Sequence, residues 1–78
     1  MKDIRPQLID IFKKVLKNEK LKLNDDSTDK DVDGWDSLAQ VELISEIEQY
    51  FDIEFALKDI SRMNSVGNIE QLIQEKTK

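Results

Sequence analysis

The sequence predicts an all-α fold, a small four-helix bundle with three long helices, one short helix and a long loop between the first two helices. Two observations support this expectation. Apolar residues recur at the i, i+4, i+7 spacing of amphipathic helices in the segments that we expect to be helical. The chain has 78 residues, the length of one small domain, and shows no repeat or linker. We therefore expect a single domain over residues 1–78.

The first helix is expected at roughly residues 3–17. Asp3 is a suitable N-cap, and Pro6 falls in the first turn, where its missing N–H costs nothing. The apolar stripe of this helix comprises Ile4, Leu8, Ile11, Phe12, Val15 and Leu16. Residues 18–35 show no helical period and form the long loop. Its apolar residues, which predict an ordered loop held against the core, are Leu21, Leu23, Val32 and Trp35.

The second helix is expected to begin at Asp36 or Ser37 and to end at Phe51. Its core-facing stripe comprises Ala39, Leu43, Ile44, Ile47 and Phe51. A second line, partly apolar and partly acidic, comprises Leu38, Val41, Ser45, Glu48 and Gln49. A short third helix is expected around the apolar residues Phe55, Leu57, Ile60 and Met63. Ser65 is the expected cap of a last helix, whose inward residues are Val66, Ile69, Leu72 and Ile73.

The composition argues against several classes of function. With no Cys and no His, the chain lacks its own thiolate and the commonest general base and metal ligand, which argues against an enzyme. A net charge of −5 and a pI of about 4.6 have the wrong sign for binding nucleic acid. No apolar run approaches the ~20 residues of a membrane span. We expect a cytoplasmic protein, a monomer, without a membrane span or a nucleic-acid partner.

The negative charge is concentrated in one segment. Residues 31–57 contain eight acids and no Lys or Arg, whereas the rest of the chain is mildly basic. Such a segment is commonly a solvated helix face with acidic loops, and it can also be a surface that meets basic partners.

Part of that segment resembles a calcium loop. Asp29, Asp31 and Asp33 followed by Gly34 fit the first half of the EF-hand pattern. Three requirements then fail. Gln40 stands where a bidentate Glu is required, the normally apolar eighth position is Asp36, and no helix leads directly into the loop. We therefore expect no metal site here.

Ser37 admits three roles. Ser37-Leu-Ala-Gln40 fits a capping box, although Asp36 is itself a suitable cap. A catalytic nucleophile needs a neighbouring base, and the chain has no His to complete a triad. As the acceptor of a group delivered by another enzyme, Ser37 would hold a phosphate ester near the free N–H groups of a helix start. These local patterns do not decide between a cap and an acceptor.

The segment from Gly34 to Ile44, GWDSLAQVELI, resembles the Asp-Ser-Leu signature of acyl carrier proteins. The resemblance continues through residues 46–55 and 65–69, and the order of helices and loop matches over nearly the whole chain. It implies a discrete carrier, a single acyl-carrier domain and not an enzyme. Ser37 would bear 4′-phosphopantetheine, transferred from coenzyme A by a phosphopantetheinyl transferase (holo-carrier synthase). Trp35 in this signature is more like stand-alone carriers of specialised pathways than carriers of primary fatty-acid synthesis.

The resemblance also implies partners and cargo. Acyl groups would travel as thioesters on the arm between acyl-loading and acyl-processing enzymes of fatty-acid, polyketide or specialised acyl-transfer pathways. Basic patches on those enzymes would meet a docking face, expected at Asp36, Leu38, Val41, Glu42 and Glu48. We expect Glu42 and Glu48 to face outward, so that substitutions at either spare the core. The alternatives are an aminoacyl or peptidyl carrier, and a carrier-like binding module that is never modified.

Calcium binding tests the reading of the acidic loop. Because Gln40 cannot supply a bidentate carboxylate, calorimetric titration at physiological ionic strength is expected to show only weak binding that magnesium shares. A sub-micromolar calcium site that is lost on substitution of Asp29, Asp31 and Asp33 would contradict this interpretation.

Overall fold

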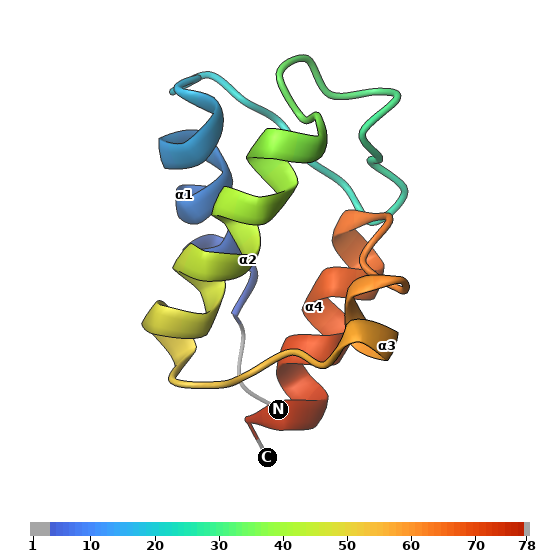
Figure 1. Ribbon diagram of the computed structural model, residues 1–78. Coiled ribbons are helices and arrows are strands. Elements are labelled where there is room, and N and C mark those ends of the chain that lie inside the picture. Colours follow the sequence, from blue (N-terminus) through green and yellow to red (C-terminus); the bar gives the residue numbers. More distant parts are fainter. Residues whose placement is uncertain (1–3, 78) are drawn as a thin grey trace.

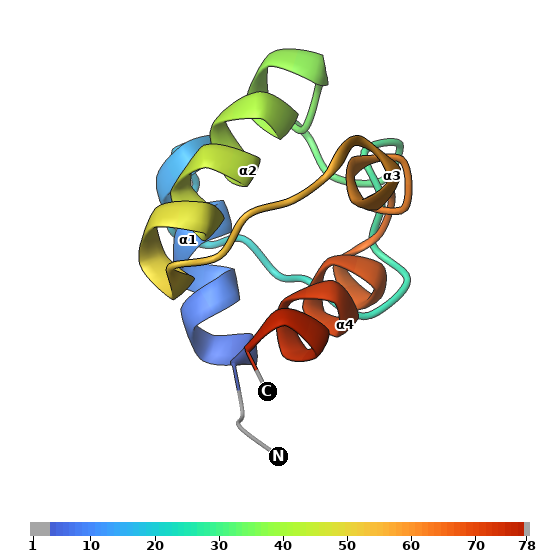
Figure 2. The same ribbon diagram turned by 60° about the horizontal axis from the view of Figure 1, so that its bottom comes forward.

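The computed structural model describes residues 4–77 and has an all-helical architecture, as predicted. The helices are α1 (Arg5–Leu16), α2 (Ser37–Phe51), the single-turn α3 (Leu57–Ile60) and α4 (Val66–Lys76). Helices α1 and α2 run antiparallel beside each other, and α4 completes the bundle with α3 alongside it (Figures 1 and 2). Among residues 4–77, no helix is both long and apolar enough to cross a membrane.

Helix α1 begins within two residues of its predicted start. The predicted cap Asp3 lies outside the described residues, and the N-cap position is Ile4, which makes no side-chain cap hydrogen bond. Pro6 occupies the first turn, as predicted. The helix ends at Leu16 because Lys17 adopts the left-handed conformation (φ 55°), and its backbone N–H donates to the carbonyl oxygen of Lys13.

The core forms where the apolar stripes of α1, α2 and α4 meet. The predicted inward residues of α4, Val66, Ile69, Leu72 and Ile73, are all buried. The same holds for Ala39, Leu43 and Ile47 of α2, while Ile44 and Phe51 are half-buried. From the long loop, Val32 and Trp35 join this core, and Leu21 and Leu23 pack against it. The prediction that the loop is ordered and held by these four residues is confirmed.

The apolar residues around the predicted short helix differ in burial. The side chain of Leu57 is 87% exposed. Helix α3 has only one turn, and Leu57 is its first residue. Phe55, Ile60 and Met63 supply the apolar contacts of this segment instead. The buried side chain within the turn is the carboxylate of Asp59.

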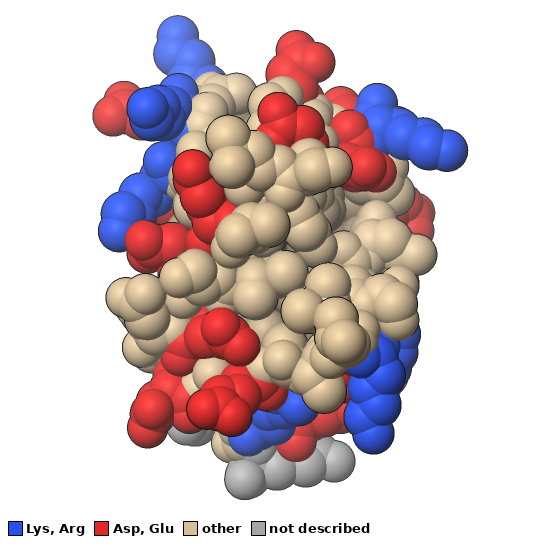
Figure 3. All heavy atoms as spheres, in the orientation of Figure 1, with Lys and Arg blue, Asp and Glu red and all other residues tan. Residues whose placement is uncertain are grey.

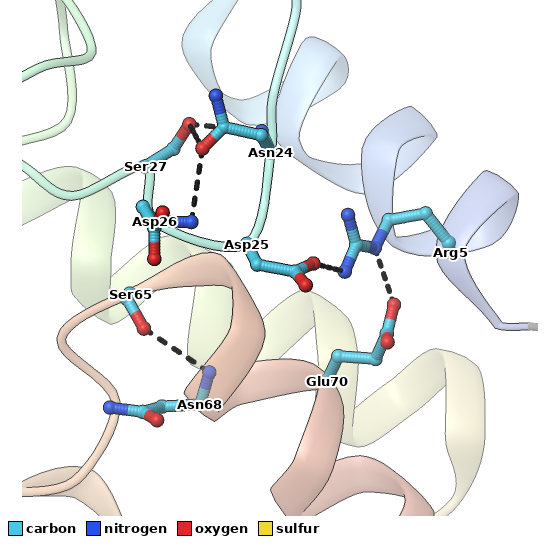
Figure 4. Close-up of polar contacts among 8 residues, drawn as sticks. All are labelled: Arg5, Asn24, Asp25, Asp26, Ser27, Ser65, Asn68 and Glu70. Atoms are coloured by element: carbon cyan, nitrogen blue, oxygen red, sulfur yellow. Dashed lines mark hydrogen bonds and ion pairs between the residues drawn. The ribbon is translucent and has the colours of Figure 1, made fainter.

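Polar contacts fix the first part of the long loop against both ends of the chain. The guanidinium of Arg5 on α1 bridges the carboxylates of Asp25 in the loop and Glu70 on α4 (Figure 4). The hydrogen bonds that Arg5 donates, first to Glu70 and then to Asp25, raise the pKa of Arg5 above its usual range. Three segments that are distant in the sequence are thereby joined through one side chain.

The loop also caps α4. The backbone N–H of Val66 donates to the carbonyl oxygen of Ser27 (3.0 Å), and that of Gly67 donates to the carbonyl oxygen of Asp25 (3.0 Å). A Cβ at Gly67 would lie 3.0 Å from that oxygen, so glycine permits the close approach. Ser65 is the N-cap of α4, as predicted, and its hydroxyl oxygen accepts from the N–H of Asn68 (3.2 Å; Figure 4). The first turn of α4 therefore holds residues 25–27 of the loop in place through backbone hydrogen bonds.

Asp59 is a buried acid that holds α3 against α4. Its Oδ2 accepts a hydrogen bond from the backbone N–H of Ala56 (2.9 Å) and pairs with Nζ of Lys76 (2.9 Å). The hydrogen bond from Ala56, followed by the contact with Lys76, lowers the pKa of Asp59 below its ordinary 3.8. Asp59 therefore stabilises the fold above about pH 4, and this contribution is lost as the pH falls through the lowered pKa.

Asp59→Asn tests this contact. The variant is expected to melt at a lower temperature than the wild type at pH 7, because the ion pair with Lys76 is lost. The difference in melting temperature between wild type and variant should become smaller as the pH falls below 3.8, since protonation then removes the same interaction from the wild type. Thermal melts from pH 7 to pH 2 provide the measurement, with Asp10→Asn as the control on an exposed acid of α1. A gap independent of pH would contradict the role of the carboxylate charge.

Candidate functional site

The approach to α2 depends on a turn at Gly34 and the burial of the next residue. Gly34 has φ +87°, a conformation that side-chain-bearing residues rarely adopt. The chain then places Trp35 in the core, where 4% of its surface is exposed and its ring meets Phe12 edge-on, with centroids 5.0 Å apart. The N–H of Trp35 donates to the carbonyl oxygen of Val32 (3.2 Å). This anchor fixes the point at which α2 begins.

Asp36 is the N-cap of α2. Its backbone is extended (φ −119°, ψ −171°), and its Oδ1 accepts from the N–H of Ala39 (2.9 Å). The capping box that the sequence allowed between Ser37 and Gln40 is not formed. Of the two capping candidates, Asp36 therefore takes this role and Ser37 does not.

Ser37 is the first residue of α2 and is exposed. Within residues 4–77 its hydroxyl group makes no hydrogen bond, and the backbone N–H groups of Ser37 and Leu38 likewise have no acceptor. It borders a hollow of about 280 Å³, whose other lining residues are Asp29, Trp35, Asp36, Gln40, Met63 and Asn64. The structure thus presents an accessible hydroxyl group beside two unused N–H donors at the positive end of a helix.

Gln40 has a position in this site that the sequence did not reveal. Its Oε1 accepts from Nε1 of Trp35 (2.6 Å), and its Nε2 donates to the carbonyl oxygen of Met63 (3.0 Å). The amide therefore joins the end of the long loop, the first turn of α2 and the segment between α3 and α4. Local patterns placed Gln40 in a capping box or at the end of a calcium loop, because neither pattern contains information about Met63.

The expected docking residues lie on α2, but not in equivalent environments. Leu38 and Val41 are 70% and 64% exposed, and Glu42 is exposed. Glu48 differs: it is half-buried, and its Oε2 accepts from the backbone N–H of Phe55 (2.9 Å). Glu48 lies outside the buried core, but its carboxylate holds the chain where it leaves α2, so a substitution that removes this acceptor would break the contact with Phe55. Figure 3 shows acidic side chains gathered over the end of α2 and uncharged ones across the middle of this face.

The acids of the calcium-like pattern do not converge on a common point. No group of three or more potential metal ligands is found among residues 4–77. The Oδ2 of Asp31 instead accepts from the hydroxyl group of Thr28 (3.2 Å). Asp29 borders the hollow beside Ser37.

The side chains around Ser37 offer few groups that could act as a general base. The residues bordering the hollow include no histidine, cysteine or lysine that could take a proton from Ser37. The carboxylate nearest in sequence, Asp36, is committed to capping the helix.

Comparisons with known proteins agree with this geometry. Residues 6–73 match the family model described as "Phosphopantetheine attachment site". An acyl carrier protein homolog of Mycoplasmopsis pulmonis (strain UAB CTIP) is 35% identical over 75 residues, 96% of this chain and 97% of that protein. The solution structure of a holo acyl carrier protein from Geobacter metallireducens superposes with a TM-score of 0.85 at 31% identity, over 91% of this chain and 82% of that one. The chain thus belongs to the acyl carrier proteins, a phosphopantetheine-bearing family of carriers that are not themselves enzymes.

Proposed function

We propose that Ser37 is the residue to which 4′-phosphopantetheine is attached. The supporting observation is that Asp36 caps α2, which leaves the Ser37 hydroxyl group exposed and, within residues 4–77, without a hydrogen bond. A phosphodiester on Ser37 would lie near the two unused N–H groups of the first turn, which suit an anion. The adjoining hollow has polar side chains at its border, which suit the amide groups of the arm.

The attachment consumes coenzyme A. The Ser37 oxygen forms a bond to the phosphorus next to pantetheine, the pyrophosphate bond breaks, and adenosine 3′,5′-bisphosphate leaves. We propose that a base on the magnesium-dependent transferase takes the hydroxyl proton, since no histidine, cysteine or lysine borders the hollow. The arm supplies the thiol that a chain without cysteine lacks. Coenzyme A and the transferase meet in the cytoplasm, which we propose as the compartment.

The docking face begins beside the attachment point. Leu38 and Val41 provide exposed apolar surface, and Glu42 and Asp36 provide negative charge. A basic patch on the transferase, or on an enzyme that loads or processes acyl groups, would complement this surface and accelerate encounter. Glu48 adds to the negative field but is also bound to Phe55.

The cargo is an acyl group held as a thioester, in fatty-acid, polyketide or specialised acyl-transfer chemistry. The Trp35 form of the signature favours a specialised pathway. An aminoacyl or peptidyl carrier would use the same anchor with a different cargo, and an unmodified module would use only the docking face. The intact mass of the protein from its native cell separates these functions. A phosphopantetheine adduct excludes the unmodified module, and a further adduct identifies the cargo.

Ser37→Ala and Asp36→Ala distinguish the attachment role proposed for Ser37 from the capping role of Asp36. Incubated with coenzyme A, magnesium and a promiscuous phosphopantetheinyl transferase, the wild type should gain one adduct by mass and Ser37→Ala none. Ser37→Ala should change the free energy of unfolding by no more than about 0.5 kcal/mol, because Ser37 makes no cap hydrogen bond. Asp36→Ala should lose about 1 kcal/mol. An adduct on Ser37→Ala would refute the assignment.

Glu42→Lys tests the docking face. The substitution should leave the melting temperature nearly unchanged, since Glu42 is exposed and makes no ion pair within residues 4–77. Its modification should be about tenfold slower at low salt, and this difference should shrink as salt rises. Asp10→Lys, the same charge change on an exposed position of α1, provides the control.

Glu48 requires a milder change because of its contact with Phe55. Glu48→Gln removes the charge and keeps an oxygen that can accept from the Phe55 N–H, whereas Glu48→Lys would also break that bond. A folded Glu42→Lys protein that is modified at the wild-type rate in low salt would show that the acidic face does not steer the transferase.

A further inference from the structure

The amide of Gln40 is the link between Ser37 and the far wall of its hollow. It accepts from Nε1 of Trp35 (2.6 Å) and donates to the carbonyl oxygen of Met63 (3.0 Å). Trp35, Gln40 and Met63 all border the hollow beside Ser37. Both partners are buried, Trp35 with 4% and Met63 with 3% of their surface exposed. A buried N–H and a buried carbonyl oxygen thus depend on one side chain.

Within residues 4–77, the bond from Gln40 to Met63 is the only side-chain hydrogen bond between α2 and residues 61–65. Asp36 binds only the first turn of its own helix, and the loop residues 25 and 27 reach α4 on its first turn. Residues 61–65 connect α3 to α4, and two of them, Met63 and Asn64, border the hollow. The bond from Gln40 to the Met63 carbonyl joins α2 to that connection.

We infer that Gln40 is a positioning residue for the modification of Ser37. It keeps the first turn of α2 at a fixed separation from Met63, so that the arm leaves Ser37 past a wall of constant shape. This inference rests on the proposed function of Ser37. The hydroxyl group must meet the phosphorus of coenzyme A in line, and the rate of such a step is sensitive to small displacements of the attacking atom.

Only an amide performs both tasks at this position. Glu can accept from Trp35 but cannot donate, and its negative charge would face the Met63 carbonyl oxygen. Leu fills a similar volume and leaves both partners without a bond. Gln40→Glu therefore loses the hydrogen bond to Met63, and Gln40→Leu loses the bonds to both Trp35 and Met63. The two variants thus remove one and two hydrogen bonds, respectively.

The test compares transferase kinetics at a temperature where every variant is fully folded. Gln40→Leu should lower kcat of phosphopantetheine transfer about tenfold, with KM nearly unchanged because Leu38 and Glu42 are intact, and Gln40→Glu should lower it less. Gln49→Leu is the matched control, since Gln49 is exposed on the same helix and, among the described residues, its side chain bonds only to Ser45 (3.2 Å). Ile69→Val controls for stability, because Ile69 is fully buried and does not border the hollow.

A second readout does not require modification. Trp35 is the only tryptophan, so acrylamide quenching of its fluorescence reports directly on the wall of the hollow. Quenching should increase in Gln40→Leu and Gln40→Glu and remain at the wild-type level in Gln49→Leu and Ile69→Val. The backbone amides of residues 63–65 should exchange with deuterium faster in Gln40→Leu than in the wild type. In Gln49→Leu and Ile69→Val they should exchange at the wild-type rate.

The outcomes separate the two proposals. If the wild type gains no adduct, the assignment of Ser37 fails. If the wild type is modified and Gln40→Leu has the same kcat, the positioning role fails while the assignment of Ser37 stands. An equal loss of kcat in Ile69→Val would trace the effect to stability and would also overturn the inference. A loss confined to the Gln40 variants, with increased quenching of Trp35, is the result expected.

Discussion

The burial of the Trp35 ring against Phe12 is the contact on which the site depends. A long loop separates α1 from α2, and a loop of that length does not by itself fix the start of the next helix. An aromatic side chain buries a large apolar area at one point, which is sufficient to fix a chain segment. With Trp35 held inward, Asp36 is placed to cap α2 and Ser37 stays at the surface. The accessibility of the Ser37 hydroxyl group is thus a consequence of core packing two residues before it.

Helices and core were predictable because they are local and repetitive. The spacing of Val66, Ile69, Leu72 and Ile73 defines one face of a helix, and Ser65 marks its start, so no distant contact was needed to place α4. Ser37 was proposed as the attachment residue from its resemblance to a signature, not from physical reasoning, since a serine at a helix start fits a cap equally well. The structure places Asp36, and not Ser37, at the N-cap position of α2.

Residues whose roles depend on distant partners were not predictable. Gln40 meets the carbonyl oxygen of Met63 across 23 positions of sequence, and no local pattern encodes that encounter. Glu48 was placed on the outward face by helical geometry alone. The chain reverses after α2 because Asp52 adopts the left-handed conformation (φ 56°), and the reversal returns the Phe55 N–H to the Glu48 carboxylate.

The acidic segment is less uniform than its count of charges indicates. The Glu46 carboxylate pairs with Nζ of Lys14 on α1 (3.0 Å), an exposed contact that contributes little to stability but partly neutralises that charge. The Asp36 carboxylate caps α2, and that of Glu48 accepts from Phe55. Glu42 has no hydrogen bond or ion pair within residues 4–77. A carboxylate already bound inside the fold loses its own contact when it reorients toward a partner. On the proposed docking face the fully available charge is therefore that of Glu42, five residues after the proposed attachment residue.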